Sequence, residues 1–166
     1  MSRTFTLVDS LALRDLQLYL TRAARVEEGS VRLIASGGVL AVYVAVFYPI
    51  GLLDEAPTVL GLRTFALKNT DAFDAVVPVR SLLERINRLE AQVPDTAAEV
   101  TATLPIEVNT VTWAAISPPK GGWVTLPPTA SALLDGVARA GIDEVARAVP
   151  TGIGEQIVHR VRSEVW

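Results

Sequence analysis

The chain has 166 residues, of which half are hydrophobic and 20% are charged, with a formal net charge of −3 and no cysteine. This length is enough for one domain with a buried core. The slight negative charge argues against a nucleic-acid-binding surface, and the lack of cysteine excludes disulfide bonds and thiolate metal sites.

The low charge and a mean hydropathy of +0.36 predict that apolar surface stays exposed on a monomer. Because exposed apolar patches on soluble proteins tend to be association surfaces, we expect a homo-oligomer. Residues 1–10 lack the apolar segment of a signal peptide, so we expect a cytoplasmic protein.

The first elements in the chain are predicted to be a short edge strand over residues 3–8 and a helix over 11–26. Asp9 or Ser10 is suited to cap this helix, because short polar side chains accept hydrogen bonds from free N–H groups. Its apolar residues follow helical spacing and form one stripe: Leu13, Leu16, Leu20 and Ala23.

Residues 31–49 predict a β-hairpin that turns at Gly37-Gly38, since two glycines suit the positive φ angles of a type I′ turn. In that register Ser36 faces Val39 and Val31 faces Val44. One face of the hairpin is then wholly apolar, with Val31, Leu33, Ala35, Leu40, Val42, Val44 and Val46. The other, which we call the mixed face, carries Arg32, Ile34, Ser36, Val39, Ala41, Tyr43, Ala45 and Phe47.

A half-apolar second face needs a cover, which can be another helix or a partner chain. We therefore expect Ile34, Tyr43 and Phe47 to lie in an interface. The uncharged run 39–50 can also be read as a membrane segment, but it is far shorter than the ~20 residues of a spanning helix. We expect no membrane partner.

Residues 58–67 predict a third strand, in which Arg63 is the only charged residue. A charged residue there needs water or an acid, so Arg63 either binds an anion or forms a salt bridge with Glu99 or Glu107. Residues 68–74 predict a loop. A helix follows Pro78, with its apolar residues at helical spacing: Val79, Leu82, Leu83, Ile86 and Leu89.

Residues 99–108 alternate as a strand, in which Pro105 requires an edge position or a bulge. Residues 111–116 predict a further short strand, and the last forty residues predict helices, with Gly141 as a candidate break. The expected fold class is α+β, a mostly antiparallel sheet of about 4–6 strands packed by helices on one face. We expect a helical C-terminal third and a single globular domain over 1–166.

Few residues point to chemistry. In the Pro- and Gly-rich loop 117–123, Lys120 and Trp123 are candidates, together with Trp113 and Arg63, to line an anion-binding pocket. The alternative is that Trp123 only fixes the loop to the core. His159, the only histidine, has no Gly-x-Ser-x-Gly partner motif, and Gly152 and Gly154 make only half of a dinucleotide fingerprint.

The loop acids match no calcium-loop spacing: Asp54, Glu55, Asp71 and Asp74. We therefore predict no catalytic residue, no metal and no cofactor.

Four segments together resemble an uncharacterised actinobacterial family of short soluble proteins: 38–44, 57–67, 117–123 and 162–166. The resemblance implies no activity and assigns no functional residue. From the residues themselves we expect a non-catalytic, self-associating cytoplasmic protein that uses the mixed face as its interface. The alternative is a protein that binds a small molecule or anion, with or without catalysis, in a pocket near 117–123.

Overall fold

The computed structural model describes residues 3–26, 29–49, 51, 54–93, 99–108, 111–115, 118–119, 121–149 and 155–165. The chain divides into two compact units, Met1–Ser117 (unit 1) and Pro118–Trp166 (unit 2). The expectation of one domain over 1–166 stays a prediction.

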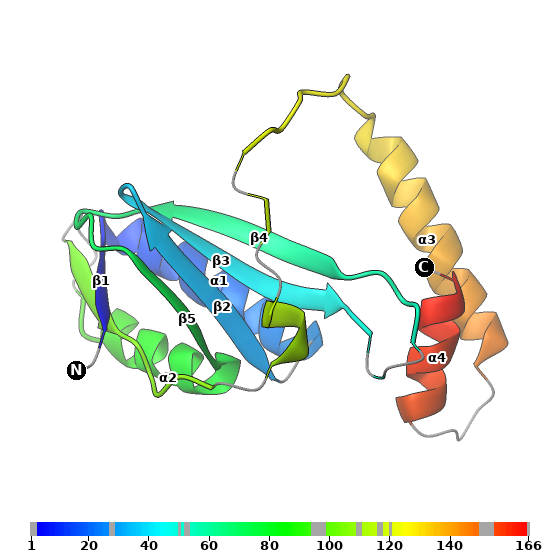
Figure 1. The fold of residues 1–166 in the computed structure, drawn as a ribbon, viewed down its shortest axis with the longest axis horizontal. Helices are drawn as coiled ribbons and strands as arrows, with labels where there is room; N and C mark the ends of the chain where they lie inside the picture. Colours follow the sequence, from blue (N-terminus) through cyan, green and yellow to red (C-terminus); the bar gives the residue numbers. More distant parts are fainter. Residues whose placement is uncertain are drawn as a thin grey trace. The chain divides into compact units, whose positions relative to one another are not determined.

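Unit 1 is built on a four-stranded antiparallel sheet with the strand order β4-β3-β2-β5 (Figure 1). Its strands are β2 (Ser30–Ser36), β3 (Val39–Phe47), β4 (Val59–Ala66) and β5 (Phe73–Pro78). The expected hairpin is confirmed, with Ser36 opposite Val39 and Val31 opposite Val44. Gly37 and Gly38 make the turn with φ angles of 58° and 79°, which side chains rarely adopt.

Two helices, α1 (Ser10–Val26) and α2 (Val79–Glu90), cover the apolar face of this sheet (Figure 1). The Asp9 carboxylate caps α1 by accepting a hydrogen bond from the Ala12 N–H at 2.7 Å, and Pro78 stands at the N-cap of α2. The helices and the apolar face share one core, whose fully buried residues include Leu13, Leu16, Leu20, Val31, Leu33, Leu40, Val42, Val77, Leu82 and Ile86. The α+β class with helices on one face is confirmed.

A second, two-stranded sheet pairs β1 (Thr4–Leu7) with β6 (Val100–Thr103). Alternation sends one side of this ribbon into the core, with Phe5, Leu7, Val100 and Ala102 buried. The other side carries threonines at 4, 6, 101 and 103. The strand predicted over 99–108 is therefore shorter and ends before Pro105, which cannot donate to a ladder.

Two local predictions were wrong. The predicted loop 68–74 is too long, because β5 begins at Phe73, and in that unpredicted strand the buried Ala75 and Val77 alternate with half-buried or exposed residues. The predicted strand 111–116 is instead a 3-10 helix, η1 (Thr112–Ala115). Such a short run carries little intrinsic preference, and the turn brings the Ala114 carbonyl to Arg32 on β2 at 2.9 Å.

Unit 2 consists of α3 (Ser131–Ala148) and α4 (Glu155–Val165), which confirms a helical C-terminal third. Gly141 lies inside α3 and does not end it. Half-buried valines lie toward the end of α3 and along α4: Val145, Val158, Val161 and Val165. Toward the start of α3, Leu133, Leu134 and Val137 are 57–61% exposed.

Candidate functional site

The mixed face of the sheet has an open part and a covered part. Leu62 on β4 pairs with Tyr43 and therefore joins this face; Leu62 is 51% and Val39 46% exposed. Ile34, Ala41 and Tyr43 between them are half-buried. We call these five residues the open half of the mixed face.

The covered part is organised by Arg32, which is 7% exposed. Its guanidinium donates to both carboxylate oxygens of Asp74 on β5, at 2.9 and 2.7 Å, and to the Ala114 carbonyl of η1 at 2.9 Å. The hydrogen bond to Asp74 raises the pKa of Arg32, although burial opposes it. Arg32 is buried while the Asp74 side chain is 46% exposed. The hydrogen bond to Ala114 ties η1 to the sheet, and a guanidinium held in this way is a structural group rather than a reactive one.

The expected interface residues fall in different environments. Ile34 and Tyr43 lie in the open half, where a partner can reach them. Phe47 is only 6% exposed, because the pairing of β3 with β4 shifts between Ala45 and Phe47 and breaks the two-residue alternation there. Phe47 therefore offers little free surface.

Arg63 is paired in the structure. It lies on β4 opposite Val42, on the side of the sheet that the helices cover, and it donates to the two carboxylate oxygens of Asp15 on α1 at 3.0 and 2.7 Å. The acids named as its candidate partners are engaged elsewhere, Glu107 by Arg3 and Glu99 by Lys68. In the structure Arg63 therefore forms a salt bridge with an acid that the sequence did not single out, and its part in an anion site stays a prediction.

The other residues predicted for an anion pocket are divided between the units. Trp113 of η1 is 6% exposed in unit 1, whereas Trp123 is 75% exposed in unit 2. Lys120, Gly152 and Gly154 lie outside the described residues, as does the side chain of His159. Neither unit by itself gathers the four predicted residues.

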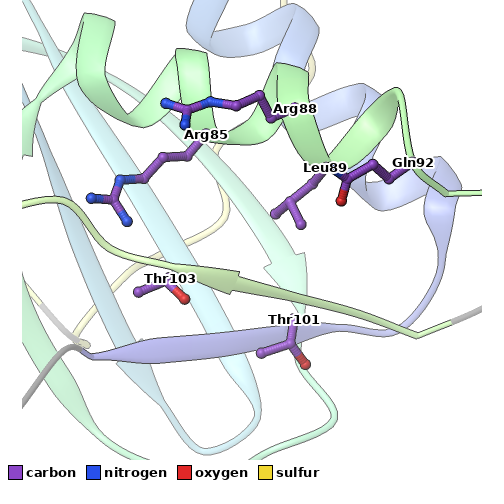
Figure 2. A pocket seen from close by; sticks show the side chains of 6 residues that line it. All are labelled: Arg85, Arg88, Leu89, Gln92, Thr101 and Thr103. Atoms are coloured by element: carbon purple, nitrogen blue, oxygen red, sulfur yellow. The ribbon is translucent and has the colours of Figure 1, made fainter.

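A pocket that the sequence did not suggest lies between α2 and β6 in unit 1 (Figure 2). It has a volume of about 190 Å³. Its lining combines four residues of the α2 region with two threonines of β6: Arg85, Arg88, Leu89, Gln92, Thr101 and Thr103. The sequence did contain a signal for its helical side, since residues 85, 88, 89 and 92 follow the i, i+3, i+4, i+7 spacing of one helix face.

Within the described ranges, acidic and histidine side chains form no group of three that can hold a metal ion. Among the same residues, no helix is both long and apolar enough to cross a membrane.

Comparisons with known proteins return two family models. One, described as a domain of unknown function (DUF8010), matches residues 1–105, and the other, also a domain of unknown function (DUF8185), matches residues 118–166. The two matches fall on either side of the boundary between unit 1 and unit 2. No curated protein and no solved structure matches the chain.

Proposed function

The chain belongs to the DUF8010 family, an uncharacterised family whose model matches residues 1–105, and from this premise we propose that it is a non-catalytic, self-associating protein. Its interface is the open half of the mixed face. The observation that carries the proposal is the 51% exposure of Leu62 and the 46% exposure of Val39 on a sheet face where Ile34, Ala41 and Tyr43 are only half-buried. Apolar surface of this kind is removed from water when two copies pack face to face.

The apolar area of the open half of the mixed face sets the affinity that we expect for the dimer. Two-fold symmetry uses each residue twice, so burying the exposed halves of Val39 and Leu62 contributes about 4 kcal/mol, before the cost of association. Ile34 and Tyr43 must supply the remaining binding free energy of the dimer. We expect a weak dimer with a dissociation constant of about 10 to 100 µM.

Sedimentation velocity over a concentration series tests this interface. We expect Leu62→Lys to raise the dissociation constant at least about tenfold, since a lysine must be desolvated inside the contact. The matched control is Leu18→Lys on α1, because Leu18 is 48% exposed and α1 lies on the opposite face of the sheet. A wild-type chain that stays monomeric at about 200 µM, or equal effects of the two variants, would refute the proposal.

A bacterial, actinobacterial origin is a further proposal, supported by the four segments that carry the family resemblance. A cytoplasmic location is also a proposal, as the sequence leads us to expect. The second candidate function is an anion-binding or enzymatic pocket near 117–123. Trp123, 75% exposed, is the feature that favours it. Tryptophan fluorescence of wild type and Lys120→Ala, titrated with citrate and inorganic phosphate, tests it; equal responses of the two proteins would count against this pocket.

A further inference from the structure

The α2–β6 pocket is formed on its helical side by one flank of α2. Val79, Leu82 and Ile86 turn into the core, and the lining residues lie on the helix surface next to them. Figure 2 shows Arg85 and Leu89 projecting from α2 toward β6. The pocket therefore presents a guanidinium beside an apolar wall.

On the strand side, Thr101 and Thr103 alternate with the buried Val100 and Ala102. The hydroxyl oxygens of Thr6 and Thr101 are 2.9 Å apart, so one of them donates to the other. That leaves the accepting hydroxyl free to donate its own hydrogen. Thr103 and Gln92 add a hydroxyl and an amide with no side-chain hydrogen bond to the described residues.

The charge in the pocket is positive. Arg85 is half-buried and forms no hydrogen bond or ion pair with any residue that the structure describes. The Nε–H of Arg88 donates to the backbone carbonyl of Glu84 at 3.3 Å, and its guanidinium lies 4.0 Å from the Glu84 carboxylate. Both side chains are over 70% exposed, and such a pair screens the charge of Arg88 weakly. None of the six lining residues carries a carboxylate.

Among the residues that the structure describes, Glu90 and Glu99 also lie near the lining residues in sequence, and both already have cations. Glu90 pairs with Arg14 at 3.5 Å and Glu99 pairs with Lys68 at 3.1 Å. A half-buried guanidinium without a counter-ion is costly, and an anion from solution removes that cost.

We propose that the α2–β6 pocket binds the phosphate group of a small phosphorylated molecule. Arg85 supplies the planar fork that binds two oxygens, and Thr103 with the Thr101 pair supplies hydroxyl donors from a second direction, which suits a tetrahedral group. The pocket, about 190 Å³, holds roughly six waters at ~30 Å³ each. It exceeds one phosphate, so an organic part of the ligand contacts Leu89.

This inference does not depend on self-association, because none of the lining residues belongs to the open half of the mixed face. The pocket is open to solvent, so we expect weak binding, with a dissociation constant of about 1 mM. Screening by salt lowers the affinity further.

NMR titration of the isotope-labelled full chain at constant ionic strength tests the pocket. The probes are inorganic phosphate, glycerol 3-phosphate and acetate, and the signals are the Arg85 side-chain Nε–H and the backbone amides of Thr101 and Thr103. We expect saturable shifts with both phosphate compounds, tighter with glycerol 3-phosphate, and at least about tenfold weaker binding of acetate.

Arg85→Gln should weaken phosphate binding at least about tenfold and Thr103→Val about threefold. The matched control is Arg80→Gln, an exposed arginine of the same helix outside the pocket, which should stay within about twofold of wild type. Equal losses in Arg85→Gln and Arg80→Gln, or shifts that never saturate, would overturn the proposal. If Arg85→Gln does not fold, unchanged binding by Thr103→Val overturns it instead.

Discussion

Unit 1 and unit 2 both contain amphipathic helices, but only unit 1 buries their apolar sides. In α1, Leu13, Leu16 and Leu20 are at most 1% exposed, because the sheet and α2 surround them. In α3, no residue is buried, and its packing partner α4 is 11 residues long against 18. An apolar stripe therefore identifies which side of a helix avoids water, while the neighbouring elements decide whether that side is covered.

The sheet of unit 1 shows the same contrast on a smaller scale. Its helical side is buried except near Val46 and Arg63, and its mixed face is buried at Arg32, where η1 packs, and at Ala45 and Phe47. Stability is thus concentrated in unit 1 between the helices and the sheet. Substitutions of the same kind should therefore have unequal effects at covered and uncovered positions.

The largest expected difference is between Leu82→Ala and Leu134→Ala. Leu82 is fully buried and Leu134 is 58% exposed, so we expect losses of about 3 kcal/mol in unit 1 and less than about 1 kcal/mol in unit 2. Urea denaturation followed by ¹⁹F NMR of 5-fluorotryptophan separates the units, through Trp113 and Trp123. An equal loss of unfolding free energy in Leu134→Ala would mean that the apolar side of α3 is covered in solution, and the two units would then not differ in this respect.

The second comparison uses two arginine–aspartate pairs of similar geometry inside unit 1. The side chain of Arg32, paired with Asp74, is 8% exposed, and that of Arg63, paired with Asp15, is 51% exposed. Asp74→Ala removes the carboxylate that Arg32, a buried guanidinium, binds and should lower the free energy of unfolding by about 2 kcal/mol. Asp15→Ala, the control, should lower it by about 0.5 kcal/mol, and similar losses would show that burial is not the deciding factor.

High pH should weaken unit 1, because Tyr19 lies in it. Burial raises the pKa of Tyr19 to about 12, with the Arg63 charge opposing it. Above the unfolded pKa of about 10, only the unfolded state loses this proton. The contribution of Tyr19 is complete below that pH and falls, by about 2 kcal/mol, as pH rises toward 12.

Tyr19→Phe removes this proton, and its unfolding free energy should therefore fall less steeply over the same pH range. Denaturant titrations at pH 9, 10 and 11 measure the two slopes. Identical slopes for Tyr19→Phe and wild type would show that Tyr19 is not buried in the folded chain.

The hairpin, the apolar face and the long helices were predictable because each rests on a strong local signal, such as the two turn glycines or the spacing of Leu82 and Ile86. β5 and η1 were missed because short segments take their structure from their neighbours. The Arg32–Asp74 pair depends on β5 lying beside β2, which no local pattern states. The α2–β6 pocket was not predicted for the same reason, because it depends on β6 lying beside α2. The sequence showed only that Arg85 and Gln92 share one helix face.

The smallest expected effects come from one substitution, Gly→Ala, with opposite signs in the two units. Gly38 has a φ of 79°, and an alanine there should destabilise unit 1 by about 1 kcal/mol. Gly136 lies inside α3, where a Cβ would meet no heavy atom within 4 Å, so alanine should stabilise the helix by about 1 kcal/mol. The same ¹⁹F titration measures both changes, with far-UV circular dichroism reporting helix content.

We expect Gly136→Ala to stabilise α3, because a helix that gains little stability from packing depends on the helix propensity of its own residues. If Gly136→Ala left unit 2 unchanged while Gly38→Ala weakened unit 1, α3 would already be held by contacts other than its own backbone. Its exposed leucines would then be the first place to look for the partner that covers them.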